Sequence, residues 1–479
     1  MNVRKKLNKY VQEMEIPEGK KVLPPGTEVE KEGRSRKNYM RWAIGAGAVC
    51  CAFLIAFVCI KVIPNVLKKS SRDYGVAGID GVIEKYSSSS RTGTDGYTAM
   101  DAELSGDPDV YDDSGVTEYE ENIMTAAAGT LTGGEIRDLK NWDNWLRTLD
   151  ENIMSAWNLF AKNRITVYVH DGSTALNNVS VKLMSGEQCC YSAVTDISGH
   201  AYLFYNIKSG EDIVPDVLQV ETSDGNYENY ELADCLNSES LAEIELQSEN
   251  PELKMDLMLV TDTTGSMGDE LEFLQAELED VILRVEEETG IDIRTSVNFY
   301  RDEGDEYVVK YYDFRENEAE VTDILREQSA NGGGDYEEAV EVALDNAING
   351  HAWADDGSIK LMFLVLDAPP HNTEEISEML YELMVEASGE GIRIIPVAAS
   401  GADDATQQLL RSFAILTGGT FVFLDDNSGV GYSHEIPVDS SEYDSEYLNS
   451  MLIRIIGEYC GVEISADKVE TETNPQQGN

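Results

Sequence analysis

The chain has 479 residues, enough for two or three domains, and its formal net charge of −54 is extreme. Residues 1–72 carry 15 Lys and Arg against 6 Asp and Glu, a balance of +9, which leaves −63 for residues 73–479. A surface this acidic repels nucleic acid and anionic membrane, so a nucleic-acid-binding role is excluded, and a solvated surface is the simplest interpretation of the remaining charge.

An apolar segment, residues 42–63, follows a basic arm at residues 1–41. No charged residue lies between Trp42 and Lys61, and about 20 apolar residues are needed to cross a bilayer. The arm is too long for the n-region of a cleavable signal peptide. The segment therefore predicts an uncleaved transmembrane signal anchor, because the alternative, a buried helix of a soluble domain, has no neighbouring sequence to cover it.

The basic residues around this segment predict its orientation. Five precede it and four follow it: Lys31, Arg34, Arg36, Lys37 and Arg41, then Lys61, Lys68, Lys69 and Arg72. This bias favours a cytoplasmic N-terminus. We therefore expect a single-pass cell-membrane protein whose acidic C-terminal bulk is extracellular.

Two segments without a clear domain pattern come next. Residues 64–132 are rich in Ser, Gly and acidic runs and are predicted to form a disordered stalk. Residues 133–162 carry Trp and Leu at helical spacing, which predicts short amphipathic helices that pack against the following domain.

Residues 163–249 are rich in short alternating segments such as ITVYV, VSVKLM and AYLFYNI, separated by turn signals such as DGS and SGE. This pattern predicts a small antiparallel β-sandwich. The stretch from VYVHDGS to AVTDISGHAYLF resembles carboxypeptidase regulatory-like and prealbumin-type sandwiches, which implies a structural or spacer role. The cysteines outside the apolar segment are Cys189, Cys190, Cys235 and Cys460. They are expected to be unpaired, mostly buried thiols, with one bridge from Cys189 or Cys190 to Cys235 as the alternative.

Residues 253–461 alternate apolar strands with amphipathic helices, and a polar tail follows at residues 462–479. This order predicts an α/β fold with a doubly wound, mostly parallel sheet. The segments 293–300 and 307–314 are predicted to form a hairpin around Gly304, which places one antiparallel strand at an edge of the sheet.

A candidate metal site begins where the first of these strands ends. Ligands of open α/β sheets bind outside the carboxyl ends of the strands. Asp262, Thr264 and Ser266 place a carboxylate and two hydroxyls in the loop there. Hard oxygen ligands suit Mg²⁺, or Mn²⁺ or Ca²⁺. A single carboxylate leaves such an ion under-neutralised, so the ion would bind an acidic side chain of a protein ligand.

These three residues match the D-x-[ST]-x-S pattern of the metal-ion-dependent adhesion site, and residues 253–461 resemble von Willebrand factor type A domains. The resemblance implies two further metal loops. Asp335 after Gly332–Gly334 stands where the family has a threonine, as a ligand or as an acceptor behind the ligands, and Asp367 ends the central strand. Sheet geometry puts the hairpin residues on the same rim, and Arg301, Asp302 and Glu303 are therefore candidate specificity contacts.

The alternatives are simpler structures. The DTTGSM segment could be a helix-capping turn, Asp367 a turn residue before prolines, and Arg301–Glu306 an acidic hairpin. His351, His371 and His434 are interpreted as ordinary surface or core residues. We find no set of nucleophile, base and orienting residue, so no enzymatic activity is expected.

The sequence therefore predicts a membrane-anchored extracellular adhesion protein of bacterial, Gram-positive type, an origin suggested by resemblance in composition. The alternative is a structural or assembly factor of a cell-envelope complex, in which the metal only stabilises the domain. A sensor role for the basic arm has no further support in the sequence.

Overall fold

The computed structural model describes residues 126–466 apart from residues 224, 432 and 438–442. The expected basic arm, the membrane segment at residues 42–63, most of the stalk and most of the polar tail lie outside these residues. Within the described part of the chain, no helix is both long and apolar enough to span a bilayer.

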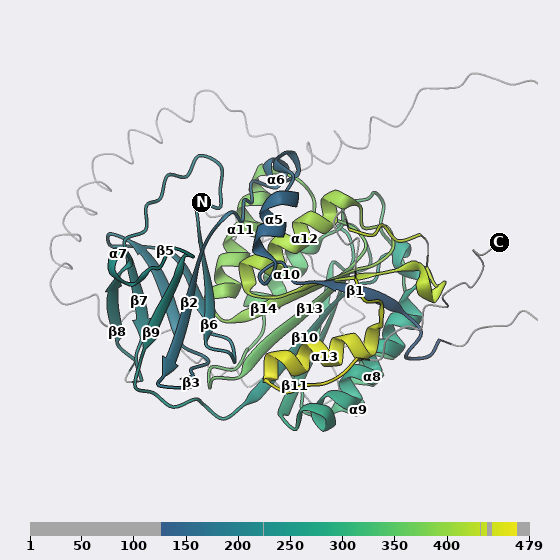
Figure 1. Ribbon diagram of the computed structural model, residues 1–479. Helices are drawn as coiled ribbons and strands as arrows, with labels where there is room; N and C mark the ends of the chain where they lie inside the picture. The colour runs from purple at the N-terminus through teal and green to yellow at the C-terminus, as the bar shows by residue number, and fades with distance from the viewer. Residues whose placement is uncertain (1–125, 224, 432, 438–442, 467–479) are drawn as a thin grey trace, which may run out of the picture. The chain divides into compact units, whose positions relative to one another are not determined.

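A mixed sheet of eight strands forms the centre of the α/β region (Figure 1). Its strand order is β12-β11-β10-β13-β14-β15-β1-β16. Neighbours from β11 to β15 pair in parallel, which confirms the prediction of a mostly parallel α/β sheet. The parallel strands are β10 (Lys254–Asp262), β11 (Asp292–Tyr300), β13 (Ile359–Leu366), β14 (Ile392–Ala398) and β15 (Phe421–Leu424).

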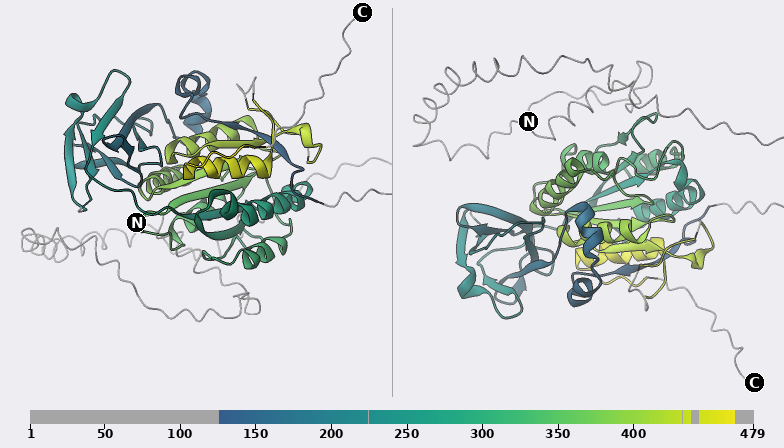
Figure 2. Two further views of the ribbon diagram at one scale, coloured as in Figure 1. Left: turned by 60° about the horizontal axis from the view of Figure 1, so that its bottom comes forward. Right: turned by 90° about the horizontal axis from the view of Figure 1, so that it is seen from above.

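Helices cover both faces of this sheet (Figures 1 and 2). Side chains of successive strand residues point to opposite faces, so Leu259 and Val260 belong to different hydrophobic clusters. One cluster contains α10 (Val340–Asn349), α11 (Glu374–Gly389) and α12 (Asp404–Thr417); the other contains α8 (Leu271–Thr289), α9 (Glu318–Arg326) and α13 (Leu448–Cys460). Burial on both faces explains why β13 and β14 are almost continuously apolar.

Antiparallel pairing occurs at both edges of the sheet. At one edge, β12 (Val309–Tyr311) pairs with β11 as the hairpin pattern indicates. At the other edge, β1 (Thr132–Ile136) pairs antiparallel with both β15 and β16 (Glu446–Tyr447). The expectation of one antiparallel edge strand was therefore incomplete. The reason is β1, which begins at the last residue assigned to the stalk and has the sequence TGGEI, without alternation.

The segment after β1 is built into the α/β region. It contains the short helices α5 (Trp142–Thr148) and α6 (Glu151–Trp157). Trp145 is fully buried, and its indole donates a hydrogen bond to the carbonyl of Ala161 at 2.8 Å. Asp138 accepts two hydrogen bonds, at 2.9 and 2.6 Å, from the guanidinium of Arg411 in α12, and both residues are buried. This segment therefore packs as part of the domain.

Residues 163–245 form two four-stranded sheets whose inward side chains share one core. One sheet contains β2 (Asn163–Asp171), β3 (Thr174–Ala175), β6 (His200–Tyr205) and β9 (Leu241–Glu245). The other contains β4 (Ser180–Ser185), β5 (Gln188–Val194), β7 (Val217–Glu221) and β8 (Tyr227–Glu231), which is followed by α7 (Leu232–Cys235). Tyr191 donates a hydrogen bond from its hydroxyl to the carbonyl of Leu416 at the end of α12. The cysteines among the described residues are free thiols, and Cys460 is buried.

Candidate metal centre

The loop after β10 brings its oxygen atoms together locally. The hydroxyl and the backbone N–H of Thr264 donate hydrogen bonds to Oδ1 of Asp262 at 2.7 and 2.8 Å. The Ser266 hydroxyl lies 3.1 Å from the Thr264 hydroxyl. Asp262 and Thr264 are fully buried, and Ser266 is exposed. The spacing i, i+2, i+4 therefore produces a small oxygen cluster that opens to solvent at Ser266.

Asp367, at the end of β13, lies next to this cluster. β13 and β10 are paired in parallel, with Val365 opposite Thr261, so both strands end at the same edge of the sheet. Burial, followed by the neighbouring charge of Asp367, raises the pKa of Asp262 to about 7. The buried Oδ2 of Asp262 accepts no hydrogen bond of normal geometry from the described residues, although the Tyr300 hydroxyl partly stabilises the Asp262 charge. The pair is thus a buried concentration of negative charge.

Glu338 adds a third carboxylate that the sequence analysis did not select. Glu338 is 2% exposed, and its Oε2 accepts no hydrogen bond from any described residue. Burial and then the charges of Asp262, Asp302 and Asp367 raise its pKa to about 9. Its backbone N–H donates to the carbonyl of Pro369 at 3.0 Å, which fixes it beside the loop that follows Asp367. Glu338 lies two residues before α10, and nothing in the local sequence distinguishes it from the adjacent Glu337.

Asp335 lies in a different group from the one expected. It lies with Asp302 and His371, and one possible metal-ligand atom from each of the three residues lies within 4.8 Å of the other two. No other group of three His, Cys, Asp or Glu residues meets this criterion in the part of the chain that the structure describes. Asp335 therefore faces the hairpin and the loop after β13. The reason is the glycine loop before it: Gly332 and Gly333 adopt positive φ angles of 83° and 72°, which glycine adopts without strain.

His371 is not an ordinary surface or core residue. Its Nε2 lies 3.4 Å from Oδ1 of Asp302, and its Nδ1 lies 3.6 Å from Oε1 of the buried Glu341. Interaction with Glu341, and then the charges of Asp302 and Glu303, raises the pKa of His371 to about 9. The ring is thus a cationic group among carboxylates at this end of the sheet.

The three hairpin residues expected on the rim have different environments. Arg301 is 5% exposed; its Nε donates to the carbonyl of Thr263 at 3.0 Å, and a terminal nitrogen donates to the carbonyl of Ser329 at 2.7 Å. It therefore holds the first metal loop against the glycine loop and is not a rim contact. Asp302 is buried, and Glu303 is exposed.

Replacing Arg301 with lysine is expected to weaken Mg²⁺ binding without removing a ligand, because one ammonium group cannot hold both carbonyls in the planar geometry of a guanidinium. Loss of a group that orients ligands costs about 10–100-fold in metal affinity. Calorimetric titration with Mg²⁺ measures the change. Arg326→Lys, on the exposed face of α9, is the matched control and should bind Mg²⁺ like wild type, whereas equal affinity for Arg301→Lys would contradict the positioning role.

The fold, the loop after β10 and the carboxylate ending β13 together point to one family. Residues 256–433 match the sequence model of the von Willebrand factor type A domain. No curated protein gives a match to the chain. Domains of this family commonly mediate protein–protein interactions and often bind a divalent metal. In the present chain the type A domain is completed by β1, which lies outside the matched residues.

The residues of the type A domain fit a divalent metal. Asp262 and Glu338 are buried carboxylates that each have one oxygen without a hydrogen bond from the described residues, and a buried charge is expensive unless it is paired. The guanidinium of Arg301, on the adjacent hairpin, is bound to two carbonyls. Hydroxyl groups of Thr264 and Ser266 supply further hard oxygens. A divalent cation would relieve the repulsion that raises the pKa of Asp262.

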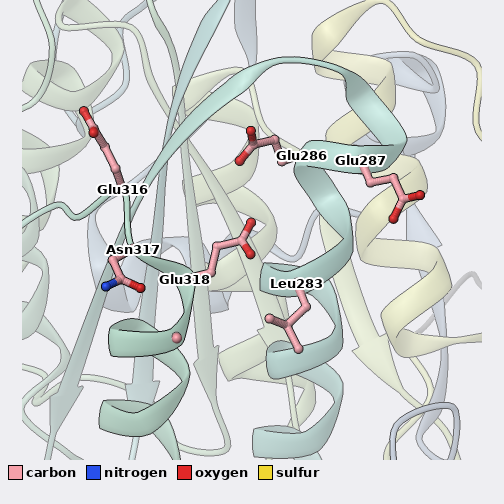
Figure 3. Close-up of a pocket in the computed structure, with 7 residues that line it drawn as sticks. Leu283, Glu286, Glu287, Glu316, Asn317 and Glu318 are labelled. Carbon is pink, nitrogen blue, oxygen red and sulfur yellow. The ribbon is translucent and has the colours of Figure 1, made fainter.

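A hollow lies near the opposite end of the strands of the same sheet, and the residues that line it have different chemistry. Its volume is about 870 Å³, and Figure 3 shows its lining between the last turn of α8 and the start of α9. Glu286, Glu287 and Glu316 are exposed there, beside the half-exposed Leu283. Solvated glutamates of this kind need no ligand, so the hollow is not assigned a function.

Proposed function

We propose that this chain is a non-enzymatic protein-recognition molecule whose type A domain binds a protein ligand through a Mg²⁺-loaded face, with Mn²⁺ or Ca²⁺ as substitutes. The metal would be held by Asp262, Thr264 and Ser266, with Asp367 and Glu338 as the neighbouring carboxylates that act on the same charge. The oxygens of the three carboxylates do not all lie within 4.8 Å of one another in this structure, so binding would draw them closer together. The observation that carries the proposal is the buried Asp262 Oδ2, which accepts no hydrogen bond of normal geometry from the described residues, beside two further buried carboxylates. Such a pocket favours a cation, and its exposed Ser266 side leaves the cation accessible to a partner.

Glu338 changes the partner chemistry expected from the sequence. With Asp262 and Asp367 it makes three carboxyl groups, and their full ionisation around a metal would exceed the charge of one divalent ion. The ion then has less need of an acidic side chain from a ligand. The same observation favours the second candidate function, an envelope assembly factor in which the metal only stabilises the domain.

Capture experiments separate these two functions. The full chain is immobilised as wild type, as Asp262→Asn and as Glu287→Gln, an exposed acidic control near the opposite end of the strands, and exposed to envelope extract with Mg²⁺ or with EDTA. Metal-dependent recognition predicts partners that wild type and Glu287→Gln retain in Mg²⁺ and that both EDTA and Asp262→Asn release. Equal recovery under all conditions would support the assembly role and overturn metal-dependent recognition.

The cellular arrangement is part of this proposal and rests on the sequence. The uncharged segment from residue 43 to residue 60 and the basic residues around it support a membrane-anchored chain with an extracellular C-terminal bulk. Fractionation of cells and protease treatment of intact cells test it. Recovery of the chain in the membrane fraction with a protease-sensitive type A domain is expected; recovery in the soluble fraction would contradict it.

A further inference from the structure

Three loops of the type A domain place two carboxylates and an imidazole around one point. Asp302 follows β11, Asp335 follows the glycine loop, and His371 follows β13. Their nearest ligand atoms all lie within 4.8 Å of one another. Asp305 ties two of these loops together, since its Oδ2 accepts hydrogen bonds from the backbone N–H of Gly333 at 2.8 Å and of Asp302 at 3.2 Å.

Unsatisfied buried oxygens give an independent indication of a missing cation. Oε2 of Glu341 and Oε2 of Glu338 accept no hydrogen bond from the described residues, and Oδ1 of Asp302 is approached only by the His371 ring, at 3.4 Å. Glu338 and Glu341 are each 2% exposed, and Asp302 is 9% exposed. Buried carboxylate oxygens without a donor are rare in folded proteins because leaving them so costs free energy. His371 is the one cationic side chain that the described ion pairs place against Asp302 and Glu341.

The orientation of His371 also suits a metal ligand, and the ring would release one proton to solvent when it binds the ion. Its Nδ1 faces the carboxylate of Glu341, and its Nε2 faces Asp302. Histidines that bind metals through one ring nitrogen commonly direct the other at a carboxylate, which fixes the tautomer and the ring plane. Glu341 is buried on α10, so it can serve as the positioning group behind the ring while Nε2 points toward the ligand cluster.

The donor set decides which metal fits. Mg²⁺ and Ca²⁺ take oxygen ligands, whereas an imidazole with two carboxylates suits Zn²⁺ or Mn²⁺. The oxygen cluster of Asp262, Thr264 and Ser266 contains no nitrogen donor. Two neighbouring cations would also match the number of carboxyl groups at this end of the sheet better than one, since Asp302 and Asp335 add to Asp262, Glu338 and Asp367.

We propose that Asp302, Asp335 and His371 form a second divalent-cation site in the type A domain, selective for Zn²⁺ or Mn²⁺ over Mg²⁺, with Glu341 orienting His371. The second site does not require the proposed recognition function. It requires only that these three loops keep their present arrangement. Its geometry also ties the hairpin to the loop after β13, so occupancy would stiffen the face through which a ligand is expected to bind.

Mn²⁺ itself is the probe for this site. The metal-stripped full chain is titrated with Mn²⁺, and pulsed electron paramagnetic resonance detects ¹⁴N coupling from a directly bound imidazole. Wild type is expected to bind two Mn²⁺ ions and to show ¹⁴N coupling. His371→Gln is expected to lose one ion together with the ¹⁴N signal, and Asp262→Asn is expected to lose the other ion and keep the signal.

Asp335→Asn provides a variant that does not threaten folding, because Asp335 is exposed. It should lose the nitrogen-coupled ion while its far-ultraviolet circular dichroism stays that of wild type. Absence of ¹⁴N coupling in wild type would overturn the second site and leave His371 as an imidazolium paired with carboxylates. Persistence of the coupling in His371→Gln would also overturn it. If Mn²⁺ binding is lost in Asp262→Asn but not in His371→Gln or Asp335→Asn, the second site is wrong and the first site stands. The two proposals can therefore fail separately.

Discussion

Asp262→Asn is expected to stabilise the metal-free protein and to abolish its stabilisation by Mg²⁺. The buried carboxylate has a pKa of about 7 in place of 3.8, which corresponds to roughly 4 kcal/mol of cost for the charged form at neutral pH. Asparagine removes that charge while keeping the side-chain size. Mg²⁺ stabilises wild type by binding the folded state, and the variant lacks the ligand. Urea denaturation in EDTA and in Mg²⁺ measures both effects.

The same group gives the metal-free protein a defined pH dependence. Because the pKa of Asp262 is higher in the folded state than in the unfolded chain, the folded state binds more protons between pH 4 and pH 7. Stability in EDTA is therefore expected to fall as pH rises through this range. Mg²⁺ needs the ionised carboxylate, so the stabilisation by Mg²⁺ should be larger at pH 8 than at pH 5.

Asp256 is the matched control, because it lies on the same strand and is also buried. Its carboxylate accepts hydrogen bonds from Arg294 at 2.8 and 2.6 Å and from the backbone N–H of Ala354 at 2.7 Å. Asp256→Asn should therefore destabilise the protein by about 2 kcal/mol with or without Mg²⁺. A metal-free Asp262→Asn that is equally destabilised, or one that Mg²⁺ still stabilises, would contradict the metal centre.

Removing the segment that contains β1 together with the β-sandwich is expected to unfold the type A domain. A fragment of residues 253–479 contains every residue matched by the family but lacks β1, which pairs with both β15 and β16. It also lacks Asp138, the partner of the buried Arg411. Residues 126–479 are the matched fragment and should give a cooperative urea transition, whereas residues 253–479 should not.

A point variant separates the buried ion pair from the rest of the segment. Asp138→Ala in the full chain should lower the free energy of unfolding by about 3 kcal/mol or more, because Arg411 stays buried without its carboxylate. Arg326→Ala, which breaks an exposed pair with Glu279 on the surface of α8 and α9, should leave the urea midpoint unchanged. If the fragment of residues 253–479 unfolds cooperatively and is stable, the type A domain folds without residues 126–252, and this prediction is wrong.

The sequence by itself determined the parts of this protein that depend on local periodicity. Continuous apolar runs predicted β10, β13 and β14, because strands buried on both faces need apolar side chains at every position. Asp262, Thr264 and Ser266 could be selected because their spacing places them in one loop, and Asp367 because it directly follows a buried strand. These features need only neighbouring residues.

The tertiary structure decided the features that join distant segments. TGGEI is a poor strand by composition, but Gly133 lies where a Cβ atom would come 2.2 Å from the carbonyl oxygen of Phe423, so its glycine permits the close pairing with β15. Asp335 and Glu338 are three residues apart, and only the path of the glycine loop places Glu338 beside Asp262 and Asp335 beside His371. The buried carboxylates of this domain come from loops that are far apart in the chain. No local sequence pattern therefore predicts that they lie together.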